Sequence, residues 1–211
     1  MNILKVTVAT SLLILAAGCG DSATGPTEPN YVASMTVGNY YVFAVSGYTI
    51  DTGDTTTVAG TLTRTIASEV THTGGFQLYR IDDVLNMTEP DTSSTTVSIY
   101  VRNESDEFRL YYDTTSTVYS VPFKYNAVVG DTWVPGINPT EQIEVTSLSA
   151  QVVAPAGTYN NCACTKETDS SEPGKTYIQY WGSNGEGVIS KVEQIPGEYY
   201  LEDELTSIYL Q

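Results

Sequence analysis

The chain has 211 residues, with 25 Asp or Glu against 9 Lys or Arg, so its formal net charge is -16. This sign excludes an ordinary nucleic-acid-binding protein, which needs basic side chains opposite the phosphates. An anionic lipid surface would also repel the chain, so any attachment to a membrane has to come from another source.

Residues 1–18 have the layout of an export signal. Lys5 supplies the positive start, and the apolar run from Val8 to Gly18 is about half of the ~20 residues that a membrane-spanning helix needs. The run ends in small residues directly before Cys19. The segment resembles the lipobox of bacterial lipoproteins, with Ala16 where Leu is commonest. The resemblance implies that Cys19 is lipidated with several acyl chains, as stable anchoring requires, while a secreted protein with an incidental cysteine is the alternative.

The residues after Cys19 predict a flexible tether and the membrane in which the protein is anchored. Residues 19–30 contain no large apolar side chain after the cysteine and are rich in Gly, Pro and polar residues, so we expect a flexible spacer. By resemblance to enterobacterial sorting signals, an Asp next to the lipidated cysteine would favour the inner membrane. Gly20 stands there and Asp21 follows, which favours the outer membrane or the cell surface. Residues 31–211 are long enough for one domain with its own core.

Alternation of apolar and polar side chains predicts strands through the rest of the chain. In residues 55–70, large apolar side chains recur at even positions between hydroxyl residues: Val58, Leu62, Ile66 and Val70. Comparable patterns cover residues 39–50, 76–81, 96–102, 108–112, 117–123, 142–148, 158–167, 177–181, 188–195 and 199–210. Turn-forming residues lie between them at 51–54, 73–75, 89–92, 103–106, 172–174 and 183–185. The pattern predicts an all-β fold, an antiparallel β-sandwich or open β-barrel of about ten strands, with residues 202–205 as one helical turn in an alternative interpretation.

Three segments recur in the same order in the two halves of this region. Residues 37–42 (VGNYYV) resemble 129–134 (VGDTWV), the residues that follow Gly75 resemble those that follow Gly157, and residues 99–107 resemble 179–186. Two related halves that share one core would explain the order, and chance similarity in a chain rich in Tyr, Gly and Val is the alternative.

The segments VGDTW at 129–133, PAGTYNNC at 155–162 and WGSNGEGV at 181–188 also resemble a group of uncharacterised, β-rich bacterial lipoproteins with the pattern VG(N/D)xW, PAGT(F/Y)xNC and GxGxV. The chain departs from the pattern at Tyr40 and Tyr41, where Trp is usual, and at Ala163 and Cys164. The resemblance implies a lipid-anchored β fold, and the group has no agreed function or catalytic residues to carry over to this chain.

The segment around the other two cysteines is interpreted as structural. Pro155 and Gly157 predict a tight corner between two strands. The alternative interpretation is a loop that binds a ligand. Cys162 and Cys164 lie on one face of a strand, with Cα atoms about 6.6 Å apart, so we expect two buried free thiols rather than a strained disulfide.

Candidate catalytic and metal-binding residues are few. The single histidine, His72, lies in a predicted exposed turn, and no nucleophile elbow accompanies it. Adjacent carboxylates such as Asp82 and Asp83 point to opposite faces of a strand, which is unsuited to glycosidase chemistry. Asp51 and Asp54 are weak candidates for calcium, but the spacing of a calcium loop is missing, so we expect neither a metal nor another cofactor.

Aromatic side chains are the remaining candidates for ligand binding. Tyr41, Trp133, Tyr180 and Trp181 belong to aromatic-rich strands, where one face of each strand is core and the other is free for stacking or for recognition of a sugar or peptide.

Three functions are consistent with these features. The first is a non-catalytic, membrane-anchored binding or envelope-interaction module whose partner is an envelope protein, a glycan or an apolar ligand. The second is a carrier of a small apolar or lipid ligand in a half-open barrel, which would need an apolar cavity of ~300 Å³ or more. The third is a hydrolase, which would need His72 or a close carboxylate pair inside a cleft. The sequence favours the first.

Overall fold

The computed structural model describes residues 29–211, and the predicted signal peptide with Cys19 lies outside the described residues. Twelve strands form one antiparallel sheet in the order β6-β5-β4-β3-β2-β1-β12-β11-β10-β9-β8-β7. The strands are β1 (Tyr40–Asp51), β2 (Asp54–Thr71), β3 (Gln77–Glu89), β4 (Ser93–Asn103), β5 (Glu107–Tyr111), β6 (Tyr119–Lys124), β7 (Thr132–Trp133), β8 (Glu141–Ala154), β9 (Gly157–Asp169), β10 (Thr176–Trp181), β11 (Val188–Ile195) and β12 (Tyr199–Tyr209). Within residues 29–211, no helix is both long and apolar enough to cross a membrane.

The all-β prediction is confirmed, and the single continuous sheet corresponds to the open-barrel alternative. Eleven of the strands were expected from alternation, although several are longer than predicted. The missing one is β7, because two residues are too few to show a period. The segment from Glu202 to Leu205 is part of β12, so the helical alternative is wrong.

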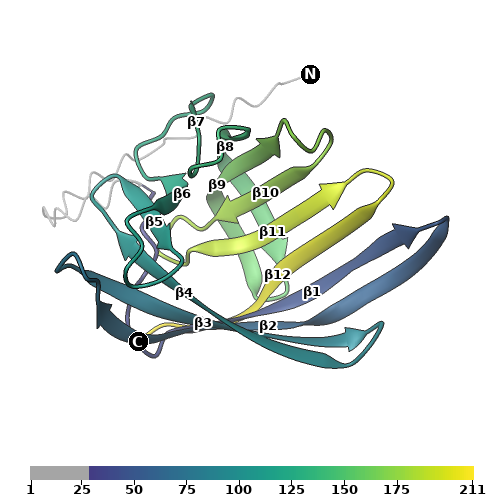
Figure 1. Cartoon of the computed structure of the whole chain (residues 1–211), viewed down its shortest axis with the longest axis horizontal. Helices are drawn as coiled ribbons and strands as arrows, with labels where there is room; N and C mark the ends of the chain where they lie inside the picture. The colour runs from purple at the N-terminus through teal and green to yellow at the C-terminus, as the bar shows by residue number, and fades with distance from the viewer. Residues whose placement is uncertain (1–28) are drawn as a thin grey trace, which may run out of the picture.

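The sheet curls into a trough whose hairpin tips gather at one end (Figure 1). The hairpins β1–β2, β3–β4, β9–β10 and β11–β12 all turn on the right of that view, and the opposite end is closed by β5, β6 and the β2–β3 turn. The β1–β2 tip is a two-residue loop in which Thr52 and Gly53 both have positive φ, 49° and 92°. Such a loop matches the right-handed twist of the strands that it joins.

The core lies where opposite sides of the curl meet. Phe123 on β6 stacks on Trp181 of β10, with ring centroids 4.8 Å apart, and Phe108 on β5 meets the same indole at 5.8 Å. Tyr31, which precedes β1, packs edge-on against Phe123. Leu205 on β12 is fully buried beside them. These contacts join the first six strands to the last six across the interior.

The two edges of the sheet also meet, at β6 and β7. The Trp133 Nε1–H donates a 2.8 Å hydrogen bond to the Val121 carbonyl oxygen, and the Val121 N–H donates to the Pro135 carbonyl. Val121, Trp133, Ile143 and Val145 form a second small core at this seam. The indole of Trp133 is therefore a structural link between the edges.

The long hairpin β8–β9 bends toward β12. Its register shifts at three places, and the Ala156 N–H at its tip donates a 2.9 Å hydrogen bond to the Leu205 carbonyl on β12. The predicted corner is present, with Gly157 at φ 148°. The bend brings Cys162 and Cys164 into buried positions as free thiols, and burial raises the pKa of Cys162 to about 11.

The two predicted halves begin with the same turn. Gly38 before β1 and Gly130 before β7 have φ values of 95° and 93°. In the first half, the Gly38 N–H donates to the Ile66 carbonyl, and the Ile66 N–H donates to the Asn39 carbonyl. In the second half, the Gly130 N–H donates to the Val145 carbonyl, and the Val145 N–H donates to the Asp131 carbonyl. The first half, β1–β6, and the second half, β7–β12, therefore anchor their second strands in the same way.

Candidate functional site

His72 is held in place by contacts of its ring and both ring nitrogens. It is buried, 5% exposed, so the prediction of an exposed turn histidine is wrong. Its ring stacks on Phe76 with centroids 4.2 Å apart, its Nδ1 accepts a hydrogen bond from the Gly74 N–H, and its Nε2 lies 3.0 Å from the Ser116 carbonyl oxygen. Because a carbonyl only accepts, Nε2 carries the proton, and both ring nitrogens serve the fold.

The adjacent carboxylates point to opposite faces of β3, as expected. Asp82 accepts hydrogen bonds from Arg80 and Ser98, whereas Asp83 binds Arg64 in the interior of the curl. The two carboxyl groups therefore have different partners on different sides of the sheet and do not form an acid–base pair.

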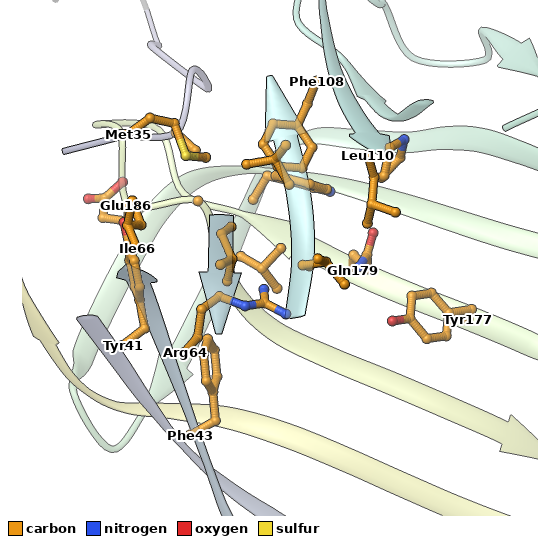
Figure 2. Close-up of a pocket in the computed structure, with 18 residues that line it drawn as sticks. Met35, Tyr41, Phe43, Arg64, Ile66, Phe108, Leu110, Tyr177, Gln179 and Glu186 are labelled. Carbon is orange, nitrogen blue, oxygen red and sulfur yellow. The ribbon is translucent and has the colours of Figure 1, made fainter. Parts of the chain in front are cut away.

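One recess lies inside the trough, between the two halves, and Figure 2 shows its lining. Its volume is about 150 Å³. The lining is mostly apolar and comes from strands of both halves: Tyr41, Phe43, Ile66, Ile81, Ile99, Val101, Phe108, Leu110, Trp181 and Val188. Four polar side chains project among them, namely Arg64, Tyr177, Gln179 and Glu186. An apolar hollow with a few fixed polar groups is typical of a small-molecule site.

The cations of the interior are already paired. Arg64 on β2 donates two hydrogen bonds to the Asp83 carboxylate on β3, at 2.9 and 2.7 Å. On the other side of β1, the Lys191 ammonium lies 2.9 Å from the Asp203 carboxylate. Burial alone would lower the pKa of each cation. Asp83 outweighs burial at Arg64, and Tyr177 together with Asp203 outweighs it at Lys191, so both pKa values are raised. Each pair is held together as charged partners in the trough.

Glu186 holds a fixed carboxylate at the edge of the recess. It accepts hydrogen bonds from the backbone N–H and the side-chain amide of Asn184, at 2.7 and 3.1 Å. A Cβ on Gly182 would come within 2.4 Å of the Glu186 carboxylate, so this approach depends on glycine. The carboxylate is therefore set in place by its own loop.

A second pocket, of about 220 Å³, lies next to the first and shares Tyr177 with it. Its lining is acidic: Glu141, Glu167, Asp169 and Glu193 face a single cation, Lys175. Lys175 already contacts Glu172 at 2.7 Å and Glu193 at 3.9 Å. Burial, followed by the charge of Glu141, raises the pKa of Glu167 to about 7, with Lys175 opposing the shift.

The register explains why these side chains converge. Glu167, Tyr177 and Glu193 are directly opposite one another on β9, β10 and β11. The next row toward the closed end contains Thr165, Gln179 and Lys191. Directly paired residues share a face of the sheet, so the inner face changes from apolar near Trp181 to acidic near Tyr177.

The structure brings together only some of the predicted site residues. Tyr41 and Trp181 line the recess, whereas Trp133 lies at the seam between the sheet edges. Tyr180 pairs with Cys164 on the opposite face of β10 from Trp181. Asp51 and Asp54 flank the β1–β2 loop, and no group of three or more His, Cys, Asp or Glu residues suited to a metal ion occurs in residues 29–211.

Sequence reasoning missed Arg64, Gln179 and Glu167. Tyr177 and Gln179 share the phase of Trp181 along β10, so alternation could have placed them on its face. No local signal marks Glu167, because its neighbours Glu141 and Glu193 come from strands that are distant in the sequence.

No protein-family model matches the chain, and a search of curated proteins found no match. Among solved structures, the chain is similar to a protein from Parabacteroides distasonis ATCC 8503 whose crystal structure is described as that of an inferred lipoprotein. The identity is 13%, the TM-score is 0.44, and the alignment covers 87% of this chain and 100% of the other.

Proposed function

We propose that the chain is a lipid-anchored, non-catalytic binding protein of the bacterial cell envelope, and that it binds a small ligand in the recess of the trough. The observation that carries the binding role is the mostly apolar hollow of about 150 Å³ with its fixed polar groups. The signal-like residues before Cys19 support the anchor and the outer membrane or cell surface as the location.

The same geometry weighs against the other two functions. The apolar hollow is about half of the ~300 Å³ that a carrier of a lipid-sized ligand would need. His72 is committed to the Ser116 carbonyl and the Gly74 N–H, outside the recess. We therefore propose recognition of a small group rather than transport or hydrolysis.

Fractionation of cells that express the full chain tests the anchor. We expect the wild type in the membrane fraction, with the mass of its acyl chains on the N-terminal peptide, and Cys19→Ala in the soluble fraction. Cys164→Ala is the matched control, because Cys164 is buried in the domain, and it should remain with the membrane. Recovery of Cys19→Ala in the membrane fraction would reject the anchor.

Native mass spectrometry of the purified full chain tests the binding site. Ile99 lines the recess, so Ile99→Phe should fill it and remove any small molecule that co-purifies with the wild type. Thr96→Phe is the control, because Thr96 lies on the same strand and is exposed. Equal retention of the molecule by Ile99→Phe and the wild type would reject this site.

A further inference from the structure

The recess and the acidic pocket adjoin along β10, where they share Tyr177. Trp181 and Gln179 line the apolar recess, Lys175 lines the acidic pocket, and Tyr177 lines both. At roughly 3.3 Å per residue, the stretch of β10 from Trp181 to Tyr177 is about 13 Å long. In Figure 2 the Tyr177 ring stands at one side of the recess, with its hydroxyl toward Gln179 and Arg64.

Negative charge is in surplus at both ends of this stretch of β10, by the Glu186 carboxylate at the recess and by several carboxylates in the acidic pocket. Within the trough, Asp83 neutralises the charge of Arg64, and Asp203 neutralises that of Lys191. In the acidic pocket, four carboxylates face one ammonium group, which is already bound to Glu172. A surplus of negative charge on a concave surface attracts a cation.

We propose that the recess and the acidic pocket together bind a small organic cation, in which a compact apolar group joined by a short chain to an ammonium group enters the recess while the ammonium faces Glu167 and Glu193. The inference rests on the proposed function, because it names the ligand class of the same site.

The dimensions define the ligand further. A cavity of about 150 Å³ is the size that holds a benzene molecule in an apolar protein interior, so one ring or a short branched alkyl group fills the recess. The ammonium then has to reach past Tyr177, which requires a linker of several bonds. The side chains that line the two pockets carry a surplus of negative charge, opposite in sign to an ammonium group. A carboxylate ligand would be repelled by Glu186 at one end and by Glu167 at the other.

The protonation of Glu167 links binding to pH. Burial and the charge of Glu141 raise the pKa of this carboxyl to about 7, so the carboxyl is partly protonated near neutral pH. The groups that face it are Glu141 on β8, Asp169 on its own strand, Lys175 and Tyr177 at the start of β10, and Glu193 on β11. Binding of an ammonium group should displace the proton, so affinity should rise as the pH rises through about 7.

Isothermal titration calorimetry of the full chain with three probes tests the proposal. Phenylbutylamine carries both the ring and the ammonium, phenylbutyrate replaces the ammonium by a carboxylate, and butylamine lacks the ring. We expect phenylbutylamine to bind about tenfold more tightly than either of the other two, since one charge contact or one buried ring contributes at least that factor.

Two variants assign the charge contact. Glu167→Gln keeps the size of the side chain and removes its charge, so phenylbutylamine should bind at least about fivefold more weakly and should lose its pH dependence. Glu144→Gln is the matched control, because Glu144 lies on β8 and is exposed on the opposite face from Ile143. This variant should bind phenylbutylamine as tightly as the wild type does. In the wild type, affinity should fall about tenfold from about pH 8 to about pH 6.

The outcomes separate this inference from the proposed function. If phenylbutyrate binds as tightly as phenylbutylamine, and Ile99→Phe but not Glu167→Gln weakens both, the recess is a ligand site and the cation inference is wrong. If no probe binds, the cation inference is again wrong, and the loss or retention of a co-purifying molecule in Ile99→Phe decides the proposed function. Equal affinity of the wild type and Glu167→Gln for phenylbutylamine would also overturn the inference.

Discussion

The two halves of the sheet share a backbone plan and differ in what they present to the interior. Each half has six strands in sequential antiparallel order and begins with a glycine turn that binds the second strand, at Gly38 and at Gly130. In the first half, the inner face near the open end carries apolar groups such as Leu62 and Leu85. In the second half, the corresponding surface carries Tyr177 and charged groups, Glu167 among them.

This difference teaches that the backbone and the chemistry of the site are specified separately. The turn and the strand pairing require only glycine and alternation, which both halves retain. The inner side chains can then change without loss of the sheet, and here they give one apolar wall and one acidic wall. The recess lies where the two walls face each other, so neither half contains the site alone.

The largest expected effect comes from the residue that joins the halves. Trp181→Ala should lower the free energy of unfolding by about 3–5 kcal/mol, because the indole packs on Phe123 and Phe108 from the first half. Denaturant unfolding followed by circular dichroism measures it. The neighbouring Tyr180 is only partly buried, so Tyr180→Ala should cost clearly less. Equal losses would mean that the halves are not joined through this aromatic cluster.

The two interior ion pairs should differ in strength. Double-mutant cycles with Met at the cation and Asn at the carboxylate should give a coupling of about 2 kcal/mol for Arg64–Asp83 and about 1 kcal/mol for Lys191–Asp203, after allowance for their partial exposure. The guanidinium makes two parallel hydrogen bonds to Asp83, whereas the ammonium makes one contact with Asp203. A larger coupling for Lys191–Asp203 would contradict this order.

The shared turn can be tested by one substitution in each half. Gly38→Ala and Gly130→Ala should each lower the free energy of unfolding by about 1–2 kcal/mol, because a positive φ is unfavourable for alanine. A Cβ on Gly38 would also meet the flexible side chain of Gln211, whereas the space around Gly130 is open. Gly136→Ala is the control without such a φ. No measurable loss at either turn would show that the matching geometry is not required.

The smallest effect should appear only as a pH dependence. The pKa of Glu167 is about 7 in the folded protein and ~4.3 in the unfolded chain, so the folded state holds its proton more tightly between these values. Stability is therefore lost as the pH rises through about 7. Glu167→Gln should be neutral below about pH 4 and should stabilise the protein by about 1 kcal/mol at about pH 8, allowing for solvent screening.

Thermal unfolding across this pH range measures the effect, with Glu144→Gln as the control on the exposed face of β8. A stabilisation by Glu167→Gln that is the same at every pH would mean that the carboxyl is not strained by its neighbours.

The elements could be predicted from the sequence where their signals are local. Residues 55–70 carry large apolar side chains at even positions and follow turn-forming residues 51–54, so strand β2 and the turn before it were both expected. His72 was wrongly assigned to an exposed turn, because the Gly-rich residues after it look like a surface loop. The contacts that bury it come from Phe76 and from Tyr111, on a strand that is far away in the sequence.

The amino-acid sequence by itself determined the all-β class, the strand phases and the signal-like start, since each depends on residues that are close together in the chain. The tertiary structure alone decided which face of each strand lines the trough, and it placed Glu167 beside Glu141 and Glu193 and Arg64 beside Asp83. The physical reason is that alternation defines two faces for a strand but does not say which is inner. Only the curl of the sheet, closed by contacts between Trp181 and the aromatic rings of β5 and β6, makes that choice.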